Sequence, residues 1–320
     1  MKPLVSIIVP FFNAAKTINR CLVSIFTQRY EPIEYIFVDD GSTDGSSECV
    51  NMLLNDYPHH REHCHFISHD VNMGSYAARC AGLRKVTGDY VIQVDADDYV
   101  EQGYIEALVE KVLQTDADLV LCDYTVIDGQ ETRQQHLPQL ASSEDLLCKM
   151  LTGEVHSALW NKLFKRTVVE TIGLNANVVK NMYDDKVLCT EALMVTKKIA
   201  QVSLSLYVYH RQLFKSTTYS TRYAIKPEMD FICFCERYFA ANDASTPVLK
   251  SFDVFKLRVR GKSLLYGSKE ELAMTAEFGG SIGKILKLQN IPFYYKGALL
   301  LDFFHLRVII YLFRLFIKKV

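Results

Sequence analysis

The sequence predicts a doubly wound α/β fold with a mostly parallel sheet, followed by a helical C-terminal region. In the first half, short apolar runs end in Pro, Gly or Asp, and amphipathic stretches of helical period separate these runs. This alternation requires right-handed crossovers between parallel strands. The strand pattern stops near residue 223, and helical patterns follow it. We therefore expect an α/β domain at 1–220 and a helical region at 221–320.

Each expected element follows from its local pattern. The first apolar run is nearly continuous and ends at Pro10, as expected for a strand buried on both faces. Ser42-Thr43-Asp44 offers N-cap side chains for the second helix, and Gly88 ends the third. The expected strands are 4–10, 33–38, 64–68, 90–94 and 119–122, and the expected helices are 13–27, 45–54, 75–86, 102–114, 225–241 and 247–267.

Composition limits the class of protein. The 320 residues are 49% hydrophobic, which is ample for a packed core. The net charge of −1 gives no reason to expect a nucleic-acid partner. The nine cysteines are an odd number without a CxxC pair, which favours reduced thiols in the cytoplasm. The opening apolar run is too short for a signal peptide, so a cytoplasmic location is expected.

Carboxylates follow two of the predicted strands. Asp39 and Asp40 end the second strand, and Asp95, Asp97 and Asp98 follow the strand at 90–94. The carboxyl edge of such a sheet is where ligands bind. Asp95 and Asp97 are two residues apart, so an extended backbone would place them on one side, where they suit Mn²⁺ or Mg²⁺. The alternative is a solvated acidic turn.

Four ordered motifs resemble the family-2 glycosyltransferases, which are inverting, nucleotide-sugar-dependent enzymes of the Rossmann-like A-type fold. The motifs are Val5–Asn13, Phe37–Asp44, Asn72–Arg79 and Gly88–Asp98, and Trp160-Asn161-Lys162-Leu163-Phe164 resembles the acceptor-side segment of the family. The resemblance implies a nucleotide-binding part at 1–125 and an acceptor-side part at 126–220. It also implies a nucleotide-sugar donor, most simply a UDP-sugar, and a glycan or lipid-linked acceptor.

The resemblance assigns residues to the donor site. Pro10 and Phe12 would line the base pocket, with Phe12 stacking on the base, and Asp40 would hydrogen-bond the base, expected to be uracil. Asp95 would lie on the ribose or metal side, and Asp97 would ligate the divalent cation that bridges the diphosphate.

Arg79 and Arg211 are the cations that the resemblance places at the donor. Arg79 would lie near it, although Cys80 replaces the Asn that often follows this Arg in the family. Arg211 ends a Tyr-x-Tyr-His-Arg strand pattern and would face the diphosphate. The family's processive members carry a Gln-x-x-Arg-Trp motif that this sequence lacks, which favours the transfer of single sugars.

The reaction also needs a general base, because the acceptor hydroxyl loses its proton as it attacks. Tyr183-Asp184-Asp185-Lys186 precedes an apolar helical pattern and resembles the family's Glu-Asp pair. On that resemblance Asp185 is the base and Asp184 takes the Glu position. Two alternatives stay open: a swap of these roles, and simple acidic capping of the helix.

The last segment, 295–320, predicts a helix that lies on a membrane surface. Arg307, Tyr311, Arg314 and Lys318 fall on one narrow helical face, and apolar residues cover most of the rest. Charges interrupt the apolar run too often for a span of about 20 residues. A peripheral contact with the cytoplasmic membrane face is expected. The alternative is a helix docked on the protein's own core or on a second subunit.

Other readings remain. The five histidines between 59 and 69 surround Cys64, but their spacing matches no standard zinc pattern. A nucleotidyltransferase would need a basic Gly-rich loop after the first strand, where Pro10–Asn13 stands instead. A catalytically silent nucleotide-sugar-binding or scaffold protein of the same fold is the main alternative to an enzyme. The sugar, the linkage and the oligomeric state are undetermined.

Overall fold

The computed structural model describes residues 2–173, 183–211, 224–288 and 291–317. The chain forms two compact units. The first takes in residues 1–143 and 157–216, and the second takes in 144–156 and 217–320. The short segment 144–156 therefore belongs with the helical unit, whereas the sequence places it in the α/β domain.

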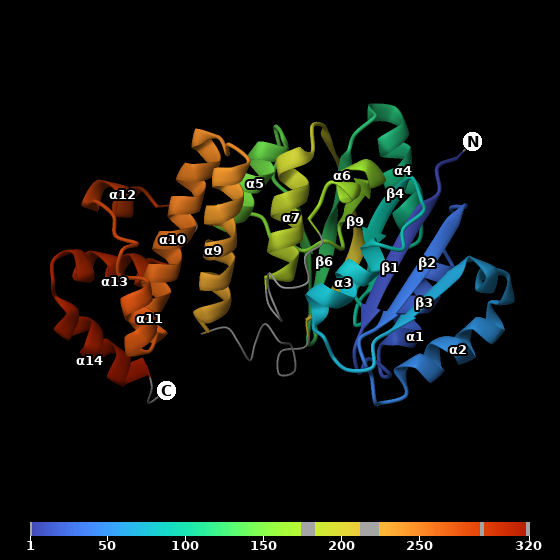
Figure 1. The fold of residues 1–320 in the computed structure, drawn as a ribbon, viewed down its shortest axis with the longest axis horizontal. Helices are drawn as coiled ribbons and strands as arrows, with labels where there is room; N and C mark the ends of the chain where they lie inside the picture. Colours follow the sequence, from blue (N-terminus) through green and yellow to red (C-terminus); the bar gives the residue numbers. More distant parts are fainter. Residues whose placement is uncertain (1, 174–182, 212–223, 289–290, 318–320) are drawn as a thin grey trace. The chain divides into compact units, whose positions relative to one another are not determined.

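The first unit begins with the expected parallel strands. Their order in the sheet is β3-β2-β1-β4, with β1 at the centre and parallel to both neighbours (Figure 1). Each connection runs through a helix, as parallel pairing requires. The elements are β1 (Val5–Phe11), α1 (Ile18–Phe26), β2 (Ile33–Asp39), α2 (Ser46–Asp56), η1 (Pro58–His63), β3 (Cys64–Ser68), α3 (Ser75–Leu83) and β4 (Tyr90–Gln93).

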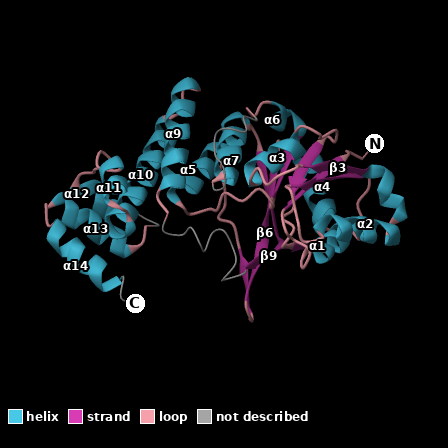
Figure 2. Cartoon of the chain, turned by 60° about the horizontal axis from the view of Figure 1, so that its bottom comes forward, coloured by secondary structure: helices cyan, strands magenta, loops and turns pink. Residues whose placement is uncertain are grey.

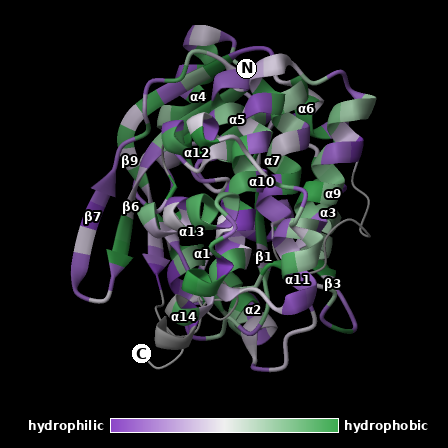
Figure 3. Cartoon of the chain, turned by 90° about the vertical axis from the view of Figure 1, so that its left-hand side faces the viewer, coloured by the Kyte–Doolittle hydropathy of each residue, from purple (hydrophilic) through white to green (hydrophobic). Residues whose placement is uncertain are grey.

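The sheet continues with antiparallel neighbours that the sequence does not predict. β8 (Lys162–Lys165) pairs antiparallel with both β4 and β6 and so separates them. The long strands β6 and β9 lie side by side and parallel (Figure 2). β7 pairs with the end of β6, and all its residues are polar (Figure 3). These elements are β5 (Tyr99–Val100), α4 (Tyr104–Thr115), β6 (Leu119–Asp128), β7 (Glu131–Gln135), β8, α6 (Arg166–Glu170), α7 (Asp184–Val195) and β9 (Ile199–Arg211).

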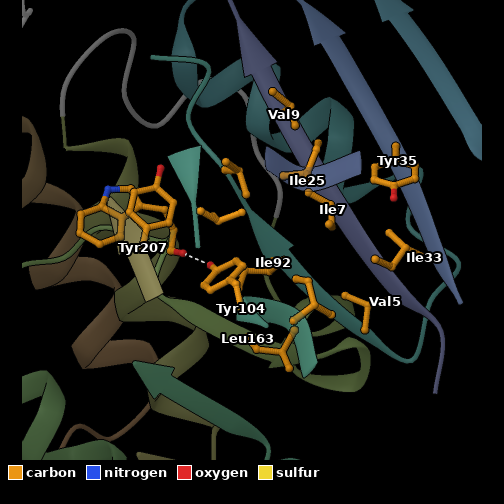
Figure 4. Packing of buried hydrophobic residues seen from close by; sticks show 14 of the residues in the cluster. Val5, Ile7, Val9, Ile25, Ile33, Tyr35, Ile92, Tyr104, Leu163 and Tyr207 are labelled. Atoms are coloured by element: carbon orange, nitrogen blue, oxygen red, sulfur yellow. Dashed lines mark hydrogen bonds between the residues drawn. The ribbon is translucent and has the colours of Figure 1, made fainter. Parts of the chain in front are cut away.

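The two faces of the sheet bury alternate residues of β1. Val5, Ile7 and Val9 point to the face that packs on α1 and α4 (Figure 4). Ile8 points to the other face, where a Cβ on Gly82 of α3 would come within 2.5 Å of it. Glycine at this position lets α3 approach the sheet closely, which fixes the helix that carries Arg79.

The second helix begins later than its expected N-cap. Gly45, with φ of 87°, is the N-cap residue, and α2 starts at Ser46. Asp44 still serves the helix start, because its Oδ1 accepts from the Ser46 amide at 3.1 Å. Ser42 instead receives the Asn13 amide on its Oγ at 3.0 Å, so it joins the loops after β1 and β2.

The second unit is helical, as predicted, but its last segment is not one helix. α13 ends at Phe303, His305 adopts a left-handed φ of 57°, and α14 begins at Arg307. Lys318 lies outside the described residues. The helices of this unit are α5 (Ser143–Thr152), α9 (Lys226–Ala241), α10 (Thr246–Tyr266), α11 (Lys269–Met274), α12 (Ile282–Lys287), α13 (Phe293–Phe303) and α14 (Arg307–Ile317). No helix within the described ranges is long and apolar enough to cross a membrane.

Candidate active site

An acidic loop follows β4 at the carboxyl edge of the sheet. The Asp98 amide donates to the Asp95 carbonyl at 3.0 Å, which closes a turn. Asp98 is fully buried, Asp95 is half-buried, and Asp97 is exposed. The loop therefore presents Asp97 and part of Asp95 outward, while Asp98 points inward.

Asp98 fixes the loop to β9. Its Oδ2 accepts from Tyr207 Oη at 2.7 Å, and its Oδ1 accepts from the His210 amide at 2.7 Å. Tyr207 Oη accepts in turn from the Asp95 amide at 3.1 Å. Trp160 stacks on the Tyr207 ring with centroids 4.2 Å apart. The sequence gives little sign of this role for Tyr207, because its partners lie more than a hundred residues away.

Arg79 of α3 joins the acidic loop to the start of α7. Arg79 is 7% exposed, and its guanidinium donates to Gln93 Oε1 at 2.7 Å and to Asp95 Oδ1 at 2.9 Å. Its Nε lies 3.0 Å from Asp184 Oδ2 and 3.3 Å from Asp185 Oδ1. Burial opposes the charge of Arg79, but the three carboxylates outweigh burial and raise its pKa above the ordinary value. Arg79 is therefore a buried cation at the centre of four polar side chains.

The sequence places Asp184 and Asp185 in the first turn of a helix, and α7 starts at Asp184. Tyr183 precedes them with a left-handed φ of 67°. Burial raises the pKa of Asp185 most, Asp184 and Asp95 raise it further, and Arg79 and Lys162 lower it. The balance leaves this pKa at about 7. A carboxylate with a pKa near neutrality, 26% exposed, suits a proton acceptor.

Lys162 is a second buried cation of this region. Its Nζ donates to the Ala158 carbonyl at 2.6 Å and to Asn161 Oδ1 at 2.9 Å. Burial lowers the pKa of Lys162, whereas the charge of Asp185 raises it. Asn161 is itself held by the Cys122 carbonyl at 2.9 Å. The Trp-Asn-Lys segment thus supports the site from within the sheet, a role that the sequence does not specify.

Asp40 lies at the end of β2 and binds the loop before α3. Its Oδ1 accepts from the Met73 amide at 2.9 Å and contacts His69 Nδ1 at 2.7 Å, and its Oδ2 accepts from the Gly74 amide at 2.8 Å. Gly41 lies against this loop, because a Cβ there would come within 2.7 Å of the Val71 carbonyl carbon. Asp40 therefore shapes this loop, and its predicted contact with a base stays a prediction.

The residues predicted for the base pocket lie beside this loop system. Pro10 lies opposite Val38, one residue before the end of β1, and Phe12 is 47% exposed. Asn13 Oδ1 accepts from the Thr43 amide at 2.9 Å, which ties the loop after β1 to the loop after β2. An exposed aromatic ring on a fixed loop is available for stacking.

Arg211 does not take part in the Arg79 cluster. It ends β9, is 55% exposed, and pairs with Asp128 at 3.4 Å. Arg20 of α1, which the sequence analysis does not single out, donates to the Asp97 carbonyl at 2.5 Å and lies over the Tyr99 ring. Arg20 is therefore a cation beside the acidic loop that sequence reasoning missed.

The histidine-rich segment has separate contacts. His60 is buried against Phe26, with Nε2 3.0 Å from its carbonyl oxygen, and His69 binds Asp40. Across the parts of the chain that the structure describes, no group of three or more His, Cys, Asp or Glu side chains could hold a metal ion. Any metal at the acidic loop would thus need ligands beyond Asp95 and Asp97.

The chain is similar in sequence to known glycosyltransferases. The family model described as "Glycosyl transferase family 2" matches residues 6–173. Glycosyltransferase GlyG of Streptococcus pneumoniae serotype 4 is 27% identical over 285 residues, which cover 85% of this chain and 90% of GlyG. GlyA of the same organism is 28% identical over 217 residues, 64% of this chain but 30% of GlyA. The uncharacterized glycosyltransferase YibD of Escherichia coli is 29% identical, covering 68% of this chain and 67% of YibD.

Two solved structures share the fold. TarS 1–349 of S. aureus in complex with UDP-GlcNAc has a TM-score of 0.67 at 16% identity, covering 97% of this chain and 89% of that one. The mannosyltransferase PcManGT of Pyrobaculum calidifontis, in complex with GDP-Man and Mn²⁺, has a TM-score of 0.58 at 18% identity, covering 96% and 81%. These likenesses confirm the predicted A-type fold with its mostly parallel sheet and helical C-terminal region.

Proposed function

Because the chain belongs to glycosyl transferase family 2, we propose that it moves a single sugar from a nucleotide-sugar to an acceptor hydroxyl with inversion. One observation carries this proposal: Arg79 bridges Asp95 of the acidic loop and the Asp184–Asp185 pair at the start of α7. A direct displacement needs leaving-group stabilisation and a base close together. Around one buried cation lie Asp95, a proposed ligand of the metal that would stabilise the leaving group, and Asp185, the proposed base.

Asp185 is the proposed base. The acceptor oxygen attacks the anomeric carbon, the bond from that carbon to the diphosphate oxygen breaks, and Asp185 takes the hydroxyl proton. Its pKa of about 7 matches this task, because about half of the carboxylate is ionised at neutral pH and the ionised form is basic enough to accept a proton. Asp184, closer to Arg79 at 3.0 Å, holds the guanidinium in place.

The donor residues fit a divalent cation. Asp97 presents an exposed carboxylate, and Asp95 is half-buried with Oδ1 held by Arg79, which leaves a small set of hard oxygen ligands. Such a partial set suits Mn²⁺ or Mg²⁺ that shares its remaining positions with water and phosphate oxygens. Asp97 and Asp95 would hold the ion, which would supply charge stabilisation for the departing diphosphate.

The nucleotide part rests on Phe12, Pro10 and Asp40, with Phe12 stacking on the base. A UDP-sugar is the proposed donor, supported by the UDP-GlcNAc bound to the TarS neighbour, although the PcManGT neighbour holds GDP-Man. Arg211 is proposed to reach the diphosphate from the end of β9. The acceptor is proposed to be a glycan or lipid-linked molecule at the cytoplasmic membrane face.

A donor panel tests this function. The purified chain is incubated with UDP-, GDP- and dTDP-sugars, each with Mn²⁺, with Mg²⁺ and with EDTA, and nucleoside diphosphate release is measured. The assay needs no acceptor, because slow hydrolysis of the donor by water also releases the nucleoside diphosphate. We expect metal-dependent release from one nucleotide class, lost in Asp97→Ala. Nucleotide binding without release, even with glycan acceptors added, would favour a catalytically silent binding protein. The absence of both nucleotide binding and nucleoside diphosphate release would refute the proposal.

A further inference from the structure

Exposed apolar side chains are concentrated on the last two helices. Of the 21 large hydrophobic side chains that are exposed in the described part of the chain, nine lie between residues 293 and 312. Exposed apolar side chains concentrated in this way are typical of an interaction site. We call these nine the α13–α14 surface: Phe293, Tyr294, Phe303, Phe304, Leu306, Val308, Ile309, Tyr311 and Leu312.

The surface belongs to helices that are already anchored. Ile310 of α14 and Leu299 of α13 are buried with Leu257 and Leu264 of α10 in one core cluster. The break at His305 lets both helices contact α10. The exposed residues therefore lie on the side of α13 and α14 that faces away from this core cluster.

The cationic stripe predicted from the sequence is partly used inside the unit. Arg307 pairs with Asp302 at 2.5 Å, and Asp302 also pairs with Arg260 at 2.8 Å. Arg314 donates to the Gly267 carbonyl. Arg307 and Arg314 thus hold α14 to its neighbours, so the contact with any partner falls to the apolar side chains.

The segment that carries the surface has an excess of positive charge. Residues 282–320 contain seven Lys and Arg residues and a single acid, Asp302. That acid pairs with Arg260 and Arg307, and Lys284 pairs with Asp253 of α10, so the excess comes from the remaining cations of the segment. An apolar surface within a cationic segment fits a partner that is apolar and anionic.

A bilayer surface meets both conditions. α14 has 11 residues and is about 16 Å long, roughly half of the hydrocarbon core of a membrane, so it fits the interface rather than a span. Five of the nine side chains are Phe or Tyr, residues that suit the boundary between headgroups and acyl chains. A second copy would bring the same excess of positive charge against this one, which opposes self-association.

We propose that the α13–α14 surface docks on a membrane rich in anionic headgroups, with its apolar side chains inserted among the acyl chains. This inference goes beyond the proposed function and does not depend on it, because vesicle binding requires no turnover. Its failure would leave the donor panel unaffected.

Cosedimentation of the full chain with vesicles tests the proposal. One set of vesicles is phosphatidylcholine alone, and the other is phosphatidylcholine with phosphatidylglycerol. The test variant carries Phe304→Ser, Val308→Ser and Leu312→Ser, at side chains 56%, 73% and 59% exposed. The matched control carries Met52→Ser, Leu113→Ser and Leu204→Ser, at side chains 61%, 65% and 55% exposed in the first unit. Thermal unfolding checks that both variants fold.

We expect the native chain and the control to bind the anionic vesicles, and salt to weaken this binding. The test variant should bind at least about tenfold more weakly, since each exposed apolar side chain contributes to insertion. Equal binding by native and test variant would overturn the proposal, as would equal affinity for neutral and anionic vesicles. A dimer in light scattering that the test variant abolishes, without vesicle binding by the native chain, would assign the surface to a second copy instead.

Discussion

Removing the charge of Arg79 should move the pH dependence of the reaction. In the native protein Asp185 acts as a base only when ionised, so kcat/KM should rise with pH through about 7. Arg79 Nε lies 3.3 Å from Asp185 Oδ1, an attraction of about 5 kcal/mol at an effective dielectric constant of roughly 20. This is an upper bound, because Asp95 and Asp184 share the same guanidinium.

Arg79→Gln should therefore raise the pKa of Asp185 by about one to two units, within the range typical for loss of a close opposite charge. Lys162 still lowers this pKa in the variant, and Asp184 and Asp95 still raise it. The assay measures nucleoside diphosphate release across the pH range. The rising, acid limb of the kcat/KM profile is fitted to give the pKa of the base. Arg79→Lys, which keeps the charge but loses the planar fork, is the matched control and should shift the limb less. An unshifted limb in a folded Arg79→Gln protein would refute the electrostatic role of Arg79.

Four further predictions concern other side chains. Asp97→Asn should raise the Mn²⁺ concentration for half-maximal activity on the order of tenfold or more, and an unchanged metal titration would contradict its role as a ligand. Phe12→Ala should raise KM for the donor about fivefold or more through lost base stacking, with kcat nearly unchanged. Burial raises the pKa of Glu191 to about 7, so the ionised side chain destabilises the native protein at pH 8. Glu191→Gln should therefore increase the free energy of unfolding by about 1–3 kcal/mol at pH 8, and this gain should fade as the pH falls from 7 to about 4. Burial alone would raise the pKa of Glu34, but its hydrogen bonds with Ser6, Thr87 and Gly88 lower this pKa on balance. Chemical denaturation of Glu34→Gln at pH 7 should therefore show a free energy of unfolding about 1–2 kcal/mol lower than that of the native chain. This difference should shrink below pH 4.

Local pattern was enough to locate the first four strands and the helix that carries the proposed base. Short apolar runs bounded by Asp and Gly predict buried strands, so β1 to β4 and the acidic loop after β4 could be predicted from the sequence. The start of α7 at Asp184 follows likewise, because acids in a first turn favour a helix.

Features that depend on distant partners did not follow. β8 is four residues long and carries no signal for its antiparallel direction between β4 and β6. The partners of Arg79 lie 14 to 106 residues away along the chain, so its central place depends on the folded sheet. The break at His305 has no Gly or Pro to announce it, and packing of both α13 and α14 against α10 accounts for it.

The most direct test of the account compares Asp185→Asn with Asp184→Asn. Nucleoside diphosphate release is measured for both variants and the native chain at pH 8, with the donor that the panel identifies. If Asp185 is the base, Asp185→Asn should lose on the order of 10²–10⁴ in kcat while retaining the native fold and donor binding. Asp184→Asn should lose less, because it removes one contact to Arg79 and leaves the base in place. Near-native turnover by a folded Asp185→Asn protein would contradict the assignment of Asp185 and the mechanism built on it.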